Sequence, residues 1–161
     1  MLTQLAIASL MVVIVVLMHL TGLALLTRML RSHHGLLLKM HVNPLALLIC
    51  ASLGIFAIHT SEIWLYSGLY LALGAATDFE QSLYFSTVTY TTIGYGDVLL
   101  PKPWRILGAI EGATGVIMLG WSTAFLISLL VQLRLLSHDW LSPGLQEPET
   151  KYLNEERSAG R

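Results

Sequence analysis

The segment at residues 91–97, which reads TTIGYGD, has the residue types and spacing with the clearest chemistry in the chain. Its two alternate glycines, Gly94 and Gly96, permit positive φ, so that consecutive backbone carbonyls can turn to one side. A row of such carbonyls, presented by several copies of the chain around one axis, can replace the water shell of a bare cation. The hydroxyl of Thr92 can join the innermost ring of oxygens. The segment is therefore a candidate cation-coordinating loop.

Ionisable side chains within apolar sequence form a second group of candidates. Glu111 lies in a long apolar run, where a carboxylate costs about 2.5–3.5 kcal/mol on membrane-insertion scales unless it is paired or hydrated. His59 and Glu62 would share a helix face, which is compatible with hydrogen bonding, metal binding or proton sensing. His19 is a single polar group that we expect to hydrogen-bond to a neighbouring helix. The histidines of the basic segment 28–42 are explained by charge placement and lipid contact.

The composition places these residues in an integral membrane protein. Of the 161 residues, 55% are hydrophobic and only 12% are charged, and the mean hydropathy is +0.67. A soluble domain carries roughly 25% charged residues, so this chain cannot cover a surface that faces water on all sides. The formal net charge of -1 gives no reason to expect a nucleic-acid partner. The single cysteine, Cys50, excludes an intrachain disulfide and a cysteine-based metal site.

Three apolar runs are long enough to cross a bilayer, and the first lies within the segment 1–27. As a helix, Leu5–Leu26 covers about 33 Å, compared with a hydrocarbon core of about 30 Å. No Lys or Arg precedes this run and no small-residue cleavage pattern follows it, so we expect a retained helix rather than a signal peptide. A basic cytoplasmic loop is expected over 28–42.

The second and third runs frame the candidate loop. The second covers 43–74, where the sequence leaves open whether one long helix or two helices form. The third covers 103–136 and begins after two prolines, Pro101 and Pro103, which suit the start of a helix. The polar residues 137–161 are expected to form a cytoplasmic tail.

A short helix is predicted over 78–90, directly before the candidate loop. Thr77 as N-cap and Glu80 three residues later have the spacing of a capping box. A helix of about a dozen residues is too short to span, so we expect a re-entrant helix. Its negative C-terminal end would point at the cation path. Irregular backbone at membrane depth, as expected for 91–97, is tolerated only where protein buries it or a water-filled path passes it.

Basic residues predict the orientation and the location of the protein. They gather between the first two spans and after the third, so both regions are assigned to the cytoplasm and the N-terminus to the outside. Lys102 and Arg105 lie on the opposite side from this majority. The plasma membrane is the expected location. Aromatic side chains are predicted to form an interfacial belt at each surface, with Trp140 in the inner belt and four residues in the outer one: Trp64, Tyr66, Tyr70 and Trp104.

The candidate loop resembles the selectivity filter of the potassium-channel family, whose signature is Thr-Val/Ile-Gly-Tyr/Phe-Gly-Asp. The match is complete from Thr92 to Asp97, and the wider resemblance runs roughly over 43–134 as outer helix, pore helix, filter and inner helix. It implies an all-α membrane protein with three transmembrane helices and a re-entrant pore helix, assembled as a homotetramer. It implies no cofactor, with K⁺ as the permeant ion. The residues that it assigns to K⁺ coordination are Thr92, Ile93, Gly94, Tyr95 and Gly96. The residues assigned to filter support are Thr91, Asp97, Glu111, Tyr84 and Phe85.

Two departures from the family pattern concern the support of the filter. Val88 stands where many members have an acidic residue, and Tyr84 and Phe85 replace a common tryptophan pair, so Phe85 has no N–H to offer Tyr95. Glu111 has three open roles: it supports the filter from behind, it faces the cavity and concentrates cations, or neighbouring Thr or Ser hydroxyls, such as those of Thr89 or Thr91, merely satisfy it.

Gly115 falls where many potassium channels have a gating hinge, and close helix packing is the alternative for this residue. No apolar helix carries regularly spaced Arg or Lys, so no voltage sensor of the usual kind is expected. The tail is too short for a regulatory domain, and any soluble regulatory partner is unspecified.

The sequence thus predicts a non-enzymatic potassium channel in a lipid bilayer. The alternatives are a weakly selective cation channel, a non-conducting accessory subunit and, least favoured, a membrane enzyme with a coincidental motif.

Overall fold

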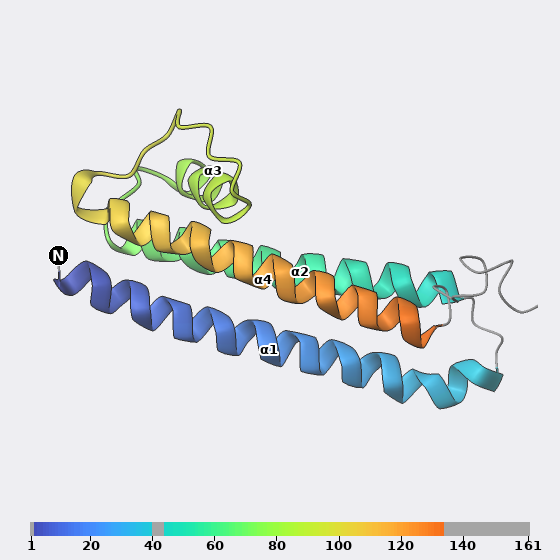
Figure 1. Ribbon diagram of the computed structural model, residues 1–161. Helices are drawn as coiled ribbons and strands as arrows, with labels where there is room; N and C mark the ends of the chain where they lie inside the picture. The colour runs from blue at the N-terminus through green and yellow to red at the C-terminus, as the bar shows by residue number, and fades with distance from the viewer. Residues whose placement is uncertain (1, 40–43, 134–161) are drawn as a thin grey trace, which may run out of the picture.

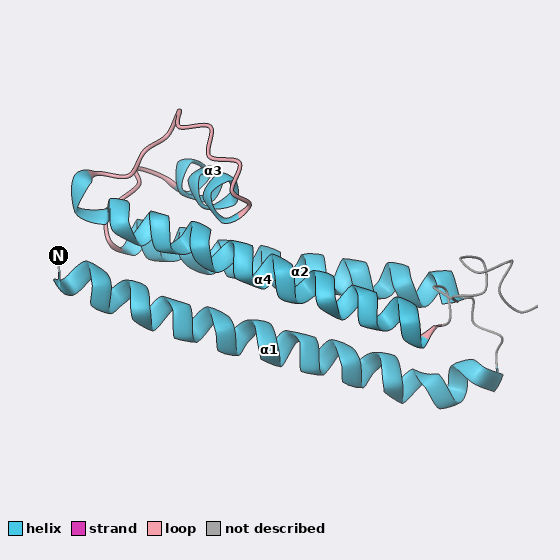
Figure 2. Ribbon diagram, viewed as in Figure 1, coloured by secondary structure: helices cyan, strands magenta, loops and turns pink. Residues whose placement is uncertain are grey.

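The chain folds into long helices with one short helix at their end. The computed structural model describes residues 2–39 and 44–133, with side chains outside 31–44. Within this part the chain forms only helices and loops (Figures 1 and 2). The elements in chain order are α1 (Leu2–Lys39), α2 (Pro44–Ala72), α3 (Phe79–Tyr90), the 3₁₀ turn η1 (Lys102–Trp104) and α4 (Arg105–Gln132).

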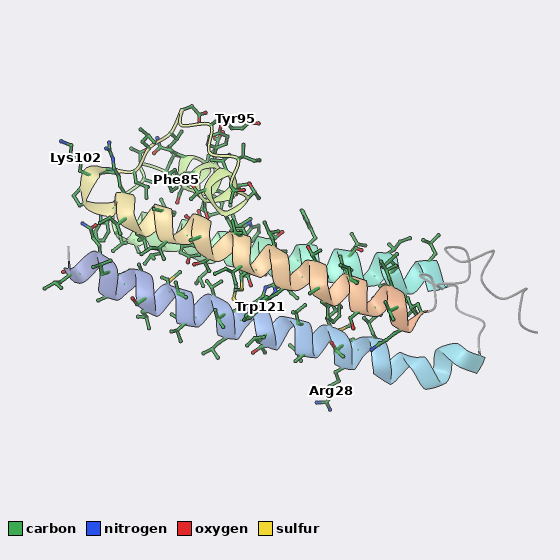
Figure 3. The ribbon with its side chains drawn as sticks, viewed as in Figure 1. Arg28, Phe85, Tyr95, Lys102 and Trp121 are labelled. Atoms are coloured by element: carbon green, nitrogen blue, oxygen red, sulfur yellow. The ribbon has the colours of Figure 1, made fainter. Side chains whose placement is uncertain are left out.

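Three of the helices can cross a membrane by length and composition, as predicted. These spans are Leu2–Leu30, Leu45–Ala72 and Lys102–Gln132. Helix α1 packs along α2 and α4, whereas α3 packs on α2 and α4 at one end of the bundle, on the side away from α1 (Figure 1). The N-terminus lies at the same end as α3, so the first span begins on the side of the candidate loop (Figure 1). Lys102 lies at this end and Arg28 toward the other (Figure 3).

Helix α1 is longer than the sequence indicated. The loop expected over 28–42 is wrong for residues 28–39, which continue α1 to Lys39. Arg, Met, Leu and Lys in this stretch are good helix formers, and no proline interrupts the chain before Pro44. The basic and polar residues of 28–39 therefore continue the helix and do not end it. The predicted tail at 137–161 lies outside the described residues.

Helix α2 is one continuous helix, which answers the question that the sequence left open over 43–74. Four polar residues follow one face of it at helical spacing and are buried against other helices: His59, Glu62, Tyr66 and Tyr70. The polar stretch therefore continues the helix because protein, rather than lipid, surrounds it. Tyr66 and Tyr70 are fully buried and stacked on each other, so their assignment to the outer aromatic belt is wrong.

Both ends of the α2–α3 connection have identifiable caps. Gly74 has φ +62 and follows α2; its N–H bonds to the carbonyl of Leu71, and that of Ala75 bonds to the carbonyl of Tyr70, which is a Schellman motif. The N-cap of α3 is Asp78, whose carboxylate accepts from the N–H of Gln81. The predicted cap at Thr77 is therefore wrong by one residue. Because Thr and Asp are both competent N-caps, local sequence did not distinguish them.

Candidate functional site

The candidate loop leaves the C-terminus of α3 with an alternating backbone. Residues 92, 94 and 96 have positive φ, at 63°, 55° and 76°, and the residues between them do not. The N–H of Thr92 bonds to the carbonyl of Thr89 at 3.0 Å, and that of Gly94 to the carbonyl of Val88 at 3.0 Å. The loop is thus anchored through its N–H groups to the last turn of α3. Thr92 bears a side chain in the left-handed region, which is a strained conformation.

The carbonyl groups of this loop are left available. Within the described part of the chain, the carbonyls of residues 92–96 accept no hydrogen bond. Tyr95 is 72% exposed and Ile93 53% exposed in the single chain, and Tyr95 lies out on the loop (Figure 3). The loop therefore presents unpaired acceptors and apolar side chains that a single chain leaves uncovered.

Asp97, at the end of the loop, is held by α3. The hydroxyl of Tyr84 donates to Asp97 Oδ2 at 2.6 Å. This hydrogen bond holds the pKa of the Asp97 carboxyl below its ordinary value and raises the pKa of Tyr84. Tyr84 was predicted to belong to the support of the loop although it replaces a tryptophan of the family pattern, and its hydroxyl contacts Asp97.

Glu111 is buried between three helices. Its side chain is 0% exposed, and its carboxyl group lies 2.5 Å from the hydroxyl of Tyr70 on α2 and 2.5 Å from that of Ser86 on α3. Because its side chain is fully buried within the chain, Glu111 does not face an open cavity. Its partners are not Thr89 or Thr91, since the Thr91 hydroxyl donates to the carbonyl of Thr87. Glu111 instead reaches the middle of α3 from behind.

Further hydroxyl groups fasten α3 to α2. Ser82 donates to the carbonyl of Ser67 at 2.7 Å, and Ser86 lies 3.0 Å from the carbonyl oxygen of Ile63. Tyr90, one further turn along the same face, donates to Glu62. The spacing of four residues between Ser82, Ser86 and Tyr90 was a signal for this polar face, which sequence analysis did not use.

Glycines of α4 bring it against the backbone of α3. A Cβ on Gly115 would overlap the carbonyl group of Tyr90, with its carbon only 2.9 Å away. A Cβ on Gly112 would lie 3.3 Å from the carbonyl oxygen of Thr89, and one on Gly108 would lie 3.0 Å from the Phe85 ring. The position of Gly115 thus has a packing reason, and α4 is unbroken there.

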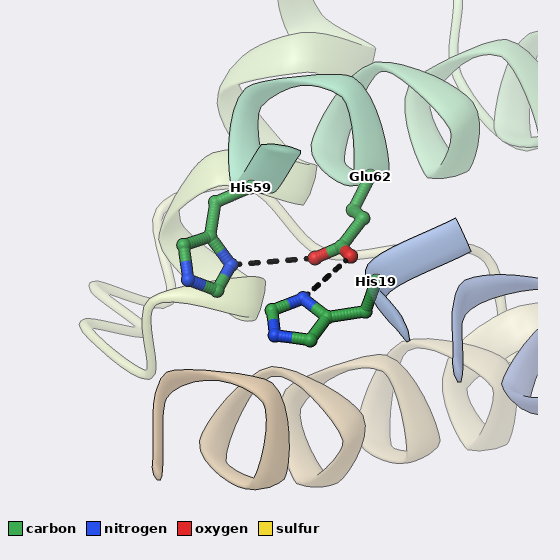
Figure 4. A group of neighbouring side chains, drawn as sticks. All are labelled: His19, His59 and Glu62. Atoms are coloured by element: carbon green, nitrogen blue, oxygen red, sulfur yellow. Dashed lines mark hydrogen bonds and ion pairs between the residues drawn. The ribbon is translucent and has the colours of Figure 1, made fainter. Parts of the chain in front are cut away.

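A buried polar cluster joins all four helices at the end of α3. His19 Nδ1 on α1 lies 2.9 Å from Glu62 Oε1, and His59 Nδ1 lies 3.3 Å from Glu62 Oε2 (Figure 4). His59 Nδ1 also lies 3.0 Å from the Tyr90 hydroxyl oxygen. Ser122 Oγ on α4 lies 3.0 Å from His59 Nε2 and 3.4 Å from His19 Nε2. The expectation that His19 bonds to a neighbouring helix is confirmed; the participation of Tyr90 and Ser122 was not predicted.

These features define a membrane protein in which a short helix, and a loop with unpaired carbonyl groups, pack at one end of a bundle of long helices. A family model described as "ion channel" matches residues 47–132, more than half of the chain. The chain therefore belongs to this ion-channel family, which is of the type with two transmembrane helices. The match covers most of α2, all of α3 and the loop, and α4, and it leaves α1 outside. Searches of the curated proteins and of the solved structures return no match.

Proposed function

We propose that four copies of this chain form a potassium-selective channel in which the loop 92–96 is the selectivity filter. K⁺ loses its water shell and is coordinated by the carbonyls of Thr92, Ile93, Gly94 and Tyr95 and by the Thr92 hydroxyl. It then moves down its electrochemical gradient. No cofactor takes part. The protein lies in the plasma membrane, with its N-terminus and filter outside and its C-terminus in the cytoplasm.

One observation carries this proposal: positive φ alternates through residues 92, 94 and 96 while the carbonyls of 92–96 remain free of hydrogen bonds in the described part of the chain. Free carbonyls at membrane depth are expensive unless a ligand or water replaces the missing hydrogen bond. A passing cation supplies that replacement. The ion-channel family match over residues 47–132 supports the same function.

The number of oxygens that a cation needs supports a homotetramer. One chain contributes one strand of carbonyls, and a closed coordination shell requires several strands around an axis. The exposed Tyr95 and Ile93 side chains are then covered by neighbouring subunits. Asp97, held by Tyr84, and Glu111, held against α3, support the filter from its outer end and from behind.

The test is flux through the purified chain in liposomes, with K⁺ and Na⁺ measured separately. We expect K⁺ flux to exceed Na⁺ flux by at least about tenfold, a difference of about 1.4 kcal/mol. Gly94→Ala places a side chain at φ +55 and should abolish selective flux. Gly120→Ala is the matched control, because nothing lies within 4 Å of its added Cβ.

Other outcomes distinguish the alternatives. Equal K⁺ and Na⁺ fluxes would identify a weakly selective cation channel. Absence of flux from the pure tetramer would favour an accessory subunit. A chain that remains monomeric in lipid would overturn the proposal, because one strand cannot close the filter.

A further inference from the structure

The cluster of His19, His59 and Glu62 has the donor atoms of a metal site. One nitrogen from each imidazole and one carboxylate oxygen all lie within 4.8 Å of one another. The three residues are buried, with His19 and Glu62 at 0% exposed and His59 at 9%. Both Nδ1 atoms point at the same carboxylate (Figure 4). Two imidazole nitrogens and a carboxylate are ligands that suit Zn²⁺ and similar divalent ions.

We propose that His19, His59 and Glu62 bind a divalent transition-metal ion of the Zn²⁺ type, with the Tyr90 hydroxyl oxygen as the fourth ligand. Tyr90 completes the set because its oxygen lies 3.0 Å from His59 Nδ1 and bonds to Glu62. Four donors match the coordination number that zinc prefers in proteins.

The surroundings of the imidazoles support metal binding. Metal-bound histidines usually donate their second ring N–H to an oxygen, which fixes the ring. Here both Nε2 atoms face one oxygen, Ser122 Oγ, at 3.0 Å and 3.4 Å. With metal on both Nδ1 atoms, both Nε2–H groups donate to the two lone pairs of this hydroxyl. With two neutral imidazoles that donate through Nδ1, the single Ser122 proton satisfies only one of the two Nε2 acceptors.

Charge balance points the same way. With neutral imidazoles, Glu62 leaves one uncompensated negative charge within the span, which is costly in a membrane. A divalent ion bound at the carboxylate of Glu62 compensates that charge.

The metal would join α1 to the pore module, by which we mean the ion-channel family match at residues 47–132. His19 belongs to α1, outside the ion-channel family match, whereas Tyr90 is the last residue of α3, directly before the loop. The site therefore fixes the extra helix against the element that positions the loop. This inference does not depend on potassium selectivity.

The test uses the full chain, purified in detergent and treated with a chelator. Titration with Zn²⁺ should give one ion per chain and raise the thermal unfolding temperature, and chelator should reverse the increase. His19→Ala and Glu62→Gln should weaken binding by at least about 100-fold, and Ser122→Ala by about tenfold. Glu111→Gln is the matched control, since this buried carboxylate has no imidazole partner, and it should bind Zn²⁺ as the parent chain does. The double variant His33→Ala/His34→Ala should also bind normally.

A further variant separates a metal site from a hydrogen-bonded cluster in case His19→Ala does not fold. His59→Cys keeps a zinc ligand at that position and removes the imidazole, so Zn²⁺ binding should persist. The proposal is overturned if the chain binds no stoichiometric Zn²⁺, or if binding is lost in the His33→Ala/His34→Ala variant instead. A stability that responds to pH and not to Zn²⁺ would also overturn it, because a proton on one imidazole then neutralises the cluster.

Discussion

Two buried carboxylates, Glu111 and Glu62, hold α3 at different points along its length, and their partners differ in kind. Both side chains are 0% exposed and both bond to a hydroxyl of α3. Among the described residues, Glu111 has only hydroxyl partners, from Tyr70 and Ser86. Glu62 has imidazole partners in addition, from His19 and His59. A glutamate at position 111 therefore joins helices through hydrogen bonds to hydroxyls. A glutamate at position 62 lies beside imidazoles and is the proposed metal ligand.

The hydrogen bonds of Ser86 show how the protonation of Glu111 differs from that of Glu62. The Ser86 hydroxyl has one proton and lies near two oxygens, the Ile63 carbonyl at 3.0 Å and Glu111 Oε1 at 2.5 Å. A carbonyl can only accept, so both contacts are hydrogen bonds when Glu111 carries the proton and donates to Ser86. A neutral acid needs no cation. Within the described residues, Glu62 has no carbonyl group beside it and instead faces two imidazole nitrogens and the Tyr90 hydroxyl.

The two carboxylates also link different sets of helices. Glu111 links α4 to α2 and α3, which all lie within the ion-channel family match. Glu62 links α2 and α3 to α1, which lies outside that match. Glu111 thus links the three helices within residues 47–132 to one another, and Glu62 links the additional helix, α1, to them.

The largest expected effect comes from separating α3 from α4, which would disturb both carboxylate sites together. Gly115→Ala places a methyl group against the Tyr90 carbonyl, which is backbone and cannot rotate away. Overpacking typically costs about 1–3 kcal/mol, and we expect the upper end of this range here. The measurement is the thermal unfolding temperature in detergent, together with K⁺ flux.

Gly120→Ala is the comparison within the same helix, because its added Cβ meets nothing within 4 Å. This variant should unfold at the temperature of the parent chain. If Gly115→Ala were equally stable, the packing role of Gly115 would be wrong and the hinge interpretation would gain support.

A glutamine at each carboxylate position should give opposite results. At position 111, the amide NH₂ can donate to Ser86 while its oxygen accepts from Tyr70, so Glu111→Gln should change stability and flux little. At position 62, the amide removes the charge that faces the imidazoles and Tyr90, and its NH₂ is paired only if an imidazole changes tautomer or Tyr90 turns its proton elsewhere, so we expect a loss of about 1–3 kcal/mol. Thermal unfolding of both variants checks this difference. Equal losses would show that the two sites do not differ in kind.

Sequence patterns predicted the elements of this molecule better than their contacts. Apolar run length predicted the three spans, because a bilayer fixes the length that a helix needs. A capping pattern predicted the short helix. The loop was recognisable because Gly94 and Gly96 are adjacent in sequence to the residues whose carbonyls they turn. Such features depend on near neighbours only.

The contacts of the carboxylates depend on residues that are distant in sequence. Glu62 meets Tyr90 and His19 only after three helices have packed, and no local spacing specifies that meeting. For the same reason, the roles considered for Glu111 allowed for a neighbouring serine hydroxyl but did not identify Ser86 or Tyr70 as its partners. The serine and tyrosine face of α3 was readable at its spacing of four residues, although its target on α2 was not.

The smallest expected effect lies at the outer end of the loop, where an exposed carboxylate contrasts with the two buried ones. Tyr84→Phe removes the hydroxyl that holds the pKa of Asp97 below its ordinary value. In the parent chain, the contribution of this hydrogen bond is fully present above the ordinary pKa of Asp, 3.8, and is lost as pH falls through the lowered value. It is also lost at high pH as Tyr84 ionises above its raised pKa.

In Tyr84→Phe, Asp97 should protonate at a higher pH, so the K⁺ to Na⁺ flux ratio should begin to fall at a higher pH on acidification. Thr87→Val, which changes another exposed hydroxyl of α3 whose bond is to the Leu83 carbonyl, should keep the parent profile. Identical acid profiles for Tyr84→Phe and the parent chain would mean that the Tyr84 hydroxyl does not support the filter.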